Sequence, residues 1–202
     1  MQKQANGAGG SASSCSETGL AGLVIGVGVV CALHVGKLPP ALPVLRDELG
    51  VSLVQGGFLL SLVQLGGMFL GAIAGMLADR LGPRRIMLAG LLVLSLACVA
   101  GAAAPGVSVL LLTRALEGLG FLLAVLPAPS LLRRMVREPK ALNSALGFWG
   151  AYMPLGAATA LFFGPLLYAF VGWRATWLAL ALLSLCCLGL VWRLVPPRCC
   201  RR

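Results

Sequence analysis

Charged side chains are scarce in this chain of 202 residues. Lys, Arg, Asp and Glu make up 11% of it, and only six residues are acidic, whereas charged residues make up about 25% of a typical soluble domain. Apolar residues reach 59%, and the mean hydropathy is +0.95. A water-soluble globular fold is therefore a poor match to this composition, and lipid is the expected solvent.

Several catalytic signatures are missing as well. The single histidine, His34, excludes a His-Glu-x-x-His zinc site, and no Gly-x-Ser-x-Gly nucleophile elbow occurs. Gly36-Lys37 lacks the upstream glycine of a phosphate-binding loop. A membrane-embedded hydrolase, the main enzymatic alternative, therefore has no nucleophile and base that can be named. We predict that the chain is not an enzyme and uses no cofactor and no metal.

Long apolar runs dominate what is present. A helix needs about 20 apolar residues to cross the hydrocarbon core of a bilayer. Six segments meet this length, namely 18–36, 51–78, 86 to a break at 104–106, that break to about 132, 141–173 and 175–192. We predict an all-α integral membrane protein with a six-helix transmembrane bundle over residues 18–195.

The segments outside these runs are short. Residues 1–17 are rich in Gly, Ala, Ser and Gln and are expected to form a disordered cytoplasmic tail. Residues 38–50 contain three prolines and form the longest external connection, and residues 196–202 form a basic cytoplasmic tail. The short connections predict one compact bundle.

Basic residues are distributed unevenly along the chain. The net charge is +10, and eleven of the 16 Lys and Arg residues lie in segments 79–85, 133–140 and 193–202. Because Lys and Arg are enriched in loops that stay in the cytoplasm, we expect a multi-pass protein of the plasma (inner) membrane with both termini in the cytoplasm. Nucleic acid is not an expected partner, since these residues do not form one basic face.

The connection between the second and third spans has the most specific spacing in the chain. It reads Gly75-Met76-Leu77-Ala78-Asp79-Arg80-Leu81-Gly82-Pro83-Arg84-Arg85. The small Gly75 permits close helix contact, and Gly82 permits a sharp turn. At the end of its helix, Asp79 can pair with a cation or with the N-terminus of a neighbouring helix.

This spacing resembles the signature loop of the major facilitator superfamily, in which a glycine, an acidic residue, a basic residue, a second glycine and a basic pair occur in the same order. The resemblance implies the N-terminal half of a secondary transporter, built as a 3+3 inverted repeat. It also implies that the loop latches the cytoplasmic side while the substrate site faces outward. The implied gate residues are Gly75, Asp79, Arg80, Gly82, Arg84 and Arg85.

A second resemblance lies in the fourth span, in the run Arg114-Ala115-Leu116-Glu117-Gly118-Leu119-Gly120. Arg114 and Glu117 share a helix face. An ionisable group inside the bilayer costs at least about 2.5 kcal/mol, so it normally faces a partner or a water-filled cavity. The resemblance implies that Arg114 lines the central cavity and helps to bind an anionic substrate or influences proton coupling. Alternatively, Arg114 and Glu117 neutralise each other near the membrane interface.

Two further features are candidates for a role in transport. His34 lies near the external end of the first span and titrates near neutral pH, so it is a candidate proton carrier, although hydrogen bonding alone is the alternative. In the fifth span, residues 147–156 resemble the Gly-Pro pattern of proton-driven exporters in the superfamily. Pro154 removes a helix hydrogen bond and Gly156 loosens packing, so we expect the helix to bend there.

The resemblance covers residues from about 20 to 195, and superfamily members consist of two six-helix halves with the substrate between them. The predicted function is secondary active transport of a small solute, with organic or inorganic anions and protons as candidates, and the overall pattern points to the cyanate-permease-like branch. The chain could be a truncated transporter, or it could pair with itself as a homodimer or with a second six-helix half. A membrane partner that transports nothing is the third alternative. Solute identity, direction and coupling ion stay open.

Overall fold

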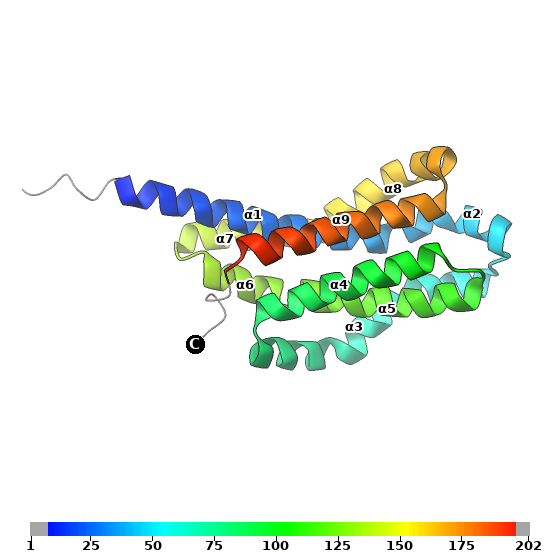
Figure 1. Ribbon diagram of the computed structural model, residues 1–202, viewed down its shortest axis with the longest axis horizontal. Coiled ribbons are helices and arrows are strands. Elements are labelled where there is room, and N and C mark those ends of the chain that lie inside the picture. The colour runs from blue at the N-terminus through cyan, green and yellow to red at the C-terminus, as the bar shows by residue number, and fades with distance from the viewer. Residues whose placement is uncertain (1–7, 197–202) are drawn as a thin grey trace, which may run out of the picture.

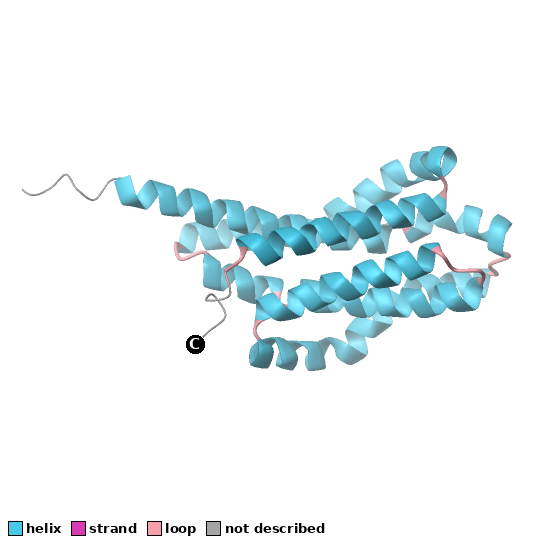
Figure 2. Cartoon of the chain, in the orientation of Figure 1, coloured by secondary structure: helices cyan, strands magenta, loops and turns pink. Residues whose placement is uncertain are grey.

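The computed structural model describes the backbone of residues 8–196 and the side chains of residues 18–65, 71, 75–77 and 80–196. Within this part of the chain every regular element is a helix (Figure 2). The helices are α1 (Ala8–Gly36), α2 (Leu38–Leu49), α3 (Leu53–Leu81), α4 (Pro83–Ala102), α5 (Val107–Val125), α6 (Ala128–Met135), α7 (Pro139–Gly150), α8 (Tyr152–Val171) and α9 (Trp173–Leu194).

Three of the spans in the described structure consist of two consecutive helices. The pairs are α1 with α2, α5 with α6, and α7 with α8, whereas α3, α4 and α9 are single helices. Five spans of the described chain are long and apolar enough to cross a membrane, namely Thr18–Leu49, Pro83–Ala102, Val107–Met135, Pro139–Val171 and Trp173–Leu194. The helix α3 has 29 residues and contributes the shorter apolar segment Leu53–Leu65 from its described side chains. The predicted all-α membrane bundle is confirmed.

The first span extends beyond both of its predicted ends. Helix α1 begins at Ala8, inside the segment expected to be a disordered tail. Residues 1–7 of that tail and residues 197–202 of the basic tail lie outside the described chain.

The predicted external connection at 38–50 is wrong, because Leu38–Leu49 forms the helix α2. Pro39 falls in the first helical turn, where a backbone N–H has no partner within the helix in any case. Leu38, Ala41 and Leu45 are buried at helical spacing. The helix ends at Gly50, whose φ of 67° is left-handed.

The long helices run side by side along one axis (Figure 1). Helix α4 packs against both α5 and α9, α1 packs against α8, and α3 packs against α5. A Cβ added to Gly120 of α5 would lie 2.5 Å from the backbone nitrogen of Leu94, and one added to Gly36 of α1 would lie 2.9 Å from the Cα of Ala157. Glycine at these points lets two backbones meet, as is common where lipid provides no hydrophobic drive for association.

Two apolar clusters fill the bundle and leave a polar layer between them. One cluster includes Val24 and Leu91, and the other includes Leu45 and Trp173. Most of the buried polar side chains lie along the helices between these clusters, namely His34, Lys37, Ser95, Thr113, Arg114, Glu117 and Ser184, whereas Thr176 lies within the second cluster, between Trp173 and Trp177. Polar groups are therefore concentrated at mid-depth, where they are most costly to bury in a membrane protein.

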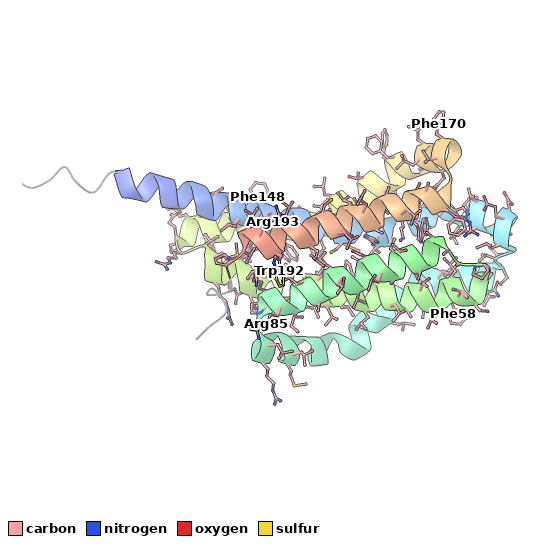
Figure 3. The ribbon with its side chains drawn as sticks, in the orientation of Figure 1. Phe58, Arg85, Phe148, Phe170, Trp192 and Arg193 are labelled. Atoms are coloured by element: carbon pink, nitrogen blue, oxygen red, sulfur yellow. The ribbon has the colours of Figure 1, made fainter. Side chains whose placement is uncertain are left out.

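The two ends of the bundle differ in charge. The α3–α4 turn, the α6–α7 connection and the end of α9 lie at the end of the bundle from which the chain enters (Figure 1). Arg85 and Arg193 lie toward this end, whereas Phe58 and Phe170 lie toward the other (Figure 3). The connections richest in Lys and Arg thus share one end of the molecule.

Candidate functional site

The connection between α3 and α4 consists of a single residue outside the two helices, Gly82. Its φ of 91° and ψ of 139° are reached readily by glycine. The Nη2 of Arg84 donates to the carbonyl oxygen of Trp192 at 2.7 Å, and its guanidinium carbon lies 5.4 Å from the centroid of the Trp192 ring. The turn is therefore attached to the C-terminal part of α9, whose carbonyl groups favour a cation.

The other proposed gate residues make fewer described contacts. The side chains of Arg80 and Arg85 are exposed, and that of Asp79 lies outside the described part of the chain. A Cβ added to Gly75 would meet no atom within 4 Å. The close helix contact expected at Gly75 is thus not made with the described residues, and α3 instead meets α5 at Gly118. The role of this loop as a gate stays a prediction.

Three charged side chains meet in the polar layer, and we refer to Lys37, Arg114 and Glu117 as the charge cluster. The Oε1 of Glu117 lies 2.9 Å from the Nζ of Lys37, and its Oε2 lies 2.5 Å from the Nη1 of Arg114. The three side chains are exposed by 2%, 3% and 2% in chain order. One carboxylate thus serves two cations, so the charge cluster carries a net positive charge of one.

Lys37 lies at the junction of α1 and α2, and its side chain is surrounded by residues of three other helices. Its Nζ donates to the Sγ of Cys98 at 3.1 Å as well as to Glu117, and it lies 4.3 Å from the centroid of the Trp177 ring. The Cys98 thiol in turn donates to the carbonyl oxygen of Trp177 at 3.2 Å. A carboxylate and an indole face are both favourable neighbours for an ammonium, so α4, α5 and α9 together hold this cation.

Arg114 also holds the junction between α1 and α2. Its Nη1 donates to the carbonyl oxygen of His34 at 2.7 Å, and its Nη2 donates to that of Val35 at 3.3 Å. Pro39 has no N–H, so it cannot supply the usual helical hydrogen bond to Val35. The guanidinium therefore takes the place of a backbone donor that the sequence has removed. On the other side of the junction, the Tyr168 hydroxyl donates to the carbonyl oxygen of Lys37 at 2.6 Å.

His34 points to a neutral partner. Its Nε2 lies 2.7 Å from the Oγ of Ser184 in α9, and its side chain is 1% exposed. Its Nδ1 is buried without a hydrogen-bond partner among the described residues. A hydrogen bond thus joins α1 to α9 next to the charge cluster, and the role of His34 as a proton carrier stays a prediction.

The donor atoms of His34, Cys98 and Glu117 lie within 4.8 Å of one another, as a metal site would require. The ammonium of Lys37, however, already bonds both the thiol and the carboxylate. Arg114 adds a second positive charge at the same carboxylate. A metal ion would have to displace one cation in the presence of another, so these residues do not suit a metal.

The fifth span is interrupted near Pro154. Helix α7 ends at Gly150 and α8 begins at Tyr152. Because Pro154 has no N–H, it cannot bond the carbonyl of Gly150, and this accounts for the interruption. Gly156 has a different role from the expected one. A Cβ there would lie 2.5 Å from the Cβ of Ala32, so Gly156 permits tight packing of α8 on α1 where looser packing was predicted.

A groove of about 520 Å³ lies between α1, α7 and α8. Ile25, Phe148 and Tyr152 are among the residues that line it, and Tyr152 stacks on Trp149 with ring centroids 4.4 Å apart. Its volume falls in the range of roughly 300–1,000 Å³ that is usual for sites that bind drug-sized molecules. The groove is lined mainly by apolar and aromatic side chains.

The sequence pattern of the Major Facilitator Superfamily matches residues 20–199. The chain belongs to this superfamily. It is 37% identical over 137 residues to the puromycin resistance protein pur8 of Streptomyces alboniger, which covers 66% of this chain and 27% of that protein. It is 30% identical over 183 residues to the methyl viologen resistance protein SmvA of Salmonella typhimurium, which covers 89% of this chain and 36% of that protein. The chain thus spans about a third or less of the length of these relatives.

The fold also matches a solved superfamily structure, that of a bacterial homolog of the human lysosomal transporter Spinster in an inward-facing, unoccupied conformation. The TM-score is 0.81 at 18% identity, and the match covers 91% of this chain and 44% of the other. The bundle is therefore half of a Major Facilitator Superfamily fold, and the protein is an integral membrane protein of a transporter family, not an enzyme. The relatives named here are resistance proteins, so the cyanate-permease-like branch stays a prediction.

Sequence reasoning within the superfamily pattern missed Lys37, Cys98 and Trp177. Lys37 directly precedes the segment 38–50, whose three prolines predicted an external connection. The helical spacing of Leu38, Ala41 and Leu45 was the available signal that the span continues past Lys37. A lysine inside a continuing span then requires a buried partner.

Proposed function

We propose that the chain forms one six-helix unit of a secondary active transporter that moves a small organic anion across the plasma membrane by alternating access. The charge cluster is the binding and coupling element in this proposal. The proton is the proposed coupling ion, and Glu117 is its candidate carrier because it is the only carboxylate in the charge cluster.

The net charge of the charge cluster is the observation that carries this proposal. Lys37 and Arg114 share the single carboxylate of Glu117, and all three are almost fully buried. An unpaired charge inside a membrane protein is costly and is normally retained for function. A bound anion would neutralise the excess charge, and its departure would restore it. The cluster can thus favour one conformation of the protein when solute is bound and another when it is absent.

A second six-helix unit completes the proposed transporter. Superfamily members bind substrate between two halves, and this chain supplies one of them. An even number of spans brings the two ends of a unit to the same membrane face, so a second copy joined in tandem would have the parallel orientation that the halves require. The uneven distribution of Lys and Arg supports a cytoplasmic location for both ends.

The names of the relatives suggest which solutes to test. Puromycin and methyl viologen are the compounds in the printed names of two relatives, and benzoate represents a small organic anion. We propose to measure flux of these three solutes in proteoliposomes with an imposed proton gradient, with the chain alone and with two copies joined in tandem. Benzoate flux that depends on the gradient is the expected result.

Matched variants assign the flux to the charge cluster. Lys37→Met removes a buried positive charge, whereas Lys140→Met removes an exposed one at the start of α7. We expect Lys37→Met to lower benzoate flux by about tenfold or more, since a tenfold change corresponds to about 1.4 kcal/mol of barrier. Lys140→Met should leave the flux unchanged. Folded protein that carries no benzoate, alone or in tandem, would overturn the proposal, whatever its flux of puromycin or methyl viologen.

A further inference from the structure

Lys37 contacts two regions of the bundle that differ in polarity. One is a pocket of about 220 Å³ between α1, α8 and α9, which is lined mainly by apolar residues such as Leu33 and Leu180. The other consists of the partners of the Lys37 ammonium, namely Glu117, Cys98 and Trp177. None of these partners is among the described residues that line the pocket, whereas Lys37 is. The lysine side chain is therefore a boundary between an apolar pocket and a polar site.

We refer to Glu117, Cys98 and Trp177 as the ammonium site, because all three face the Nζ of Lys37. The Oε1 of Glu117 lies 2.9 Å from this nitrogen, the Sγ of Cys98 lies 3.1 Å from it, and the centroid of the Trp177 ring lies 4.3 Å from it. A carboxylate, a sulfur acceptor and an indole face all attract a primary ammonium. The three side chains are buried, so a cation held there is shielded from water.

The ammonium site is held in place by contacts that do not involve Lys37. The Oε2 of Glu117 accepts a hydrogen bond from the Nη1 of Arg114. The Cys98 thiol donates to the carbonyl oxygen of Trp177 at 3.2 Å. Shortening of the lysine should therefore leave the three groups in position, and a preorganised site binds a ligand without a large ordering cost.

The pocket provides a route to the ammonium site. Phe163 and Leu167 of α8 line it and are 51% and 45% exposed, whereas Lys37 is 2% exposed. The pocket thus opens toward the surface of the bundle and ends at the lysine stem. Shortening of this stem would connect the surface with the ammonium site.

We propose that Lys37 is the built-in occupant of the ammonium site and thereby determines the charge class of the solute. While its ammonium fills the site, an organic cation finds no free acceptor there, and the excess positive charge of the charge cluster opposes a second cation. A shortened side chain at position 37 should admit a primary alkylammonium. The proposal rests on the proposed function in that it explains how the charge cluster rejects cations and admits anions. It adds the residue that makes this selection.

The length removed from position 37 defines the ligand that should fit. Lys37→Ala removes a propylammonium group beyond the Cβ, and Lys37→Val removes an ethylammonium group beyond the Cγ. Lys37→Met keeps a stem of similar length without the charge, so it blocks the space. We expect Lys37→Ala to prefer propylammonium and Lys37→Val to prefer ethylammonium. Lys37→Met and the parent chain should bind neither.

Calorimetric titration of the full chain in lipid nanodiscs measures these affinities. The probes are propylammonium, ethylammonium and the neutral 1-propanol, at one ionic strength. For Lys37→Ala we expect propylammonium to bind at least about tenfold more tightly than 1-propanol, equivalent to about 1.4 kcal/mol. It should also bind about fourfold more tightly than ethylammonium, which buries one CH₂ less. Equal affinity for propylammonium and 1-propanol, or equal affinity of Lys37→Ala and the parent chain for propylammonium, would overturn the proposal.

Thermal unfolding provides a second measurement. Because a ligand that binds only the folded state raises the melting temperature, propylammonium should stabilise Lys37→Ala and leave Lys37→Met unchanged. Lys140→Ala, which shortens an exposed lysine, is the control and should not respond. A variant that folds only when it is purified with its matching ammonium would support the proposal. Lys37→Ala and Lys37→Val that stay unfolded with every ammonium would contradict it, since the ammonium site would then not accept a free cation.

Charge selection and transport can fail separately. Propylammonium binding to Lys37→Ala, without benzoate flux by the parent chain, would keep the ammonium site and reject the proposed function. Benzoate flux that depends on Lys37, without propylammonium binding to Lys37→Ala, would keep the proposed function and reject Lys37 as the occupant of a cation site.

Discussion

Lys37 and Glu117 are 80 positions apart in the sequence, yet their charged groups lie 2.9 Å apart in the middle of the bundle. The contact joins the start of α2 to the centre of α5, and Arg114 approaches the other oxygen of the same carboxylate. Glu117 is therefore the common partner of two cations. The consequences of losing each member of the cluster differ accordingly.

Removal of Glu117 should be more damaging than removal of Lys37. Glu117→Gln leaves two buried cations without a carboxylate, and breaking a buried ion pair in this way costs about 3–5 kcal/mol. Lys37→Met leaves the Arg114 and Glu117 pair balanced in charge, so its cost should be smaller. The cost of each substitution is measured as the change in the free energy of unfolding in detergent micelles. A larger decrease in the free energy of unfolding for Lys37→Met than for Glu117→Gln would contradict the conclusion that an ionised Glu117 has two cationic partners.

Hydrophobic length made the membrane-spanning helices predictable from the sequence. The α9 helix, Trp173–Leu194, extends the expected 175–192 by two residues at each end, because an uninterrupted apolar run has one stable form in lipid. Breaks at proline were less predictable. Pro39 and Pro154 both remove a helical hydrogen bond, but only tertiary contacts decide whether a second helix follows.

The charge cluster could be predicted only in part, because it too depends on tertiary contacts. The sequence placed Arg114 and Glu117 on one helix face through their spacing of three. It could not bring Lys37 to them, because contacts between α1, α4, α5 and α9 depend on how four helices pack. Local spacing carries no information about such distant pairs, so Cys98 and Trp177 also escaped notice.

The contact between α4 and α5 should be intolerant of any added side-chain atom. A Cβ at Gly120 would lie 2.5 Å from the backbone nitrogen of Leu94, so Gly120→Ala should cost about 1–3 kcal/mol through overpacking. Gly71→Ala is the matched control, since a Cβ there would meet nothing within 4 Å, and alanine favours a helix. Thermal unfolding compares the two variants. Equal stability of both would show that α4 and α5 are not in close backbone contact.

Arg84 and Arg85 should differ in their effect on stability although they are adjacent. Arg84 bonds the carbonyl oxygen of Trp192, and a hydrogen bond at such a site contributes about 1 kcal/mol. Arg84→Ala should therefore lower the melting temperature by about 2–4 °C for a protein of this size. Arg85→Ala should leave it unchanged, because its side chain is exposed. Equal melting temperatures of the two variants would show that the contact with α9 does not stabilise this turn.

The proposed orientation can be tested with single cysteines at the two ends of the bundle. Ser substitutions of the native cysteines provide the background, and Arg85→Cys, Lys140→Cys and Arg46→Cys supply the labels. Because basic loops stay in the cytoplasm, we expect a membrane-impermeant maleimide added outside intact cells to label position 46 alone. External labelling of position 85 or 140 would reverse or reject the orientation.

Replacement of Arg114 by lysine should loosen the junction of α1 and α2 while the positive charge is kept. The guanidinium reaches the carbonyl oxygens of His34 and Val35 together with Glu117. A lysine ammonium is a point charge on a flexible stem and lacks the rigid fork for all three. Arg114→Lys should therefore leave buried carbonyls without donors, at a cost of about 1–3 kcal/mol.

Hydrogen exchange of the backbone locates this loss. We expect faster exchange in α2 of Arg114→Lys and unchanged exchange in α4, since local opening follows the contacts that are removed. Tyr168→Phe is the control, because it removes one hydrogen bond to the same junction, at the carbonyl of Lys37, and leaves every charge in place. Its effect should be smaller, about 0.5–1.5 kcal/mol. If Arg114→Lys exchanges like the parent protein throughout α2, the guanidinium does not hold the junction, and Pro39 must be compensated by another donor.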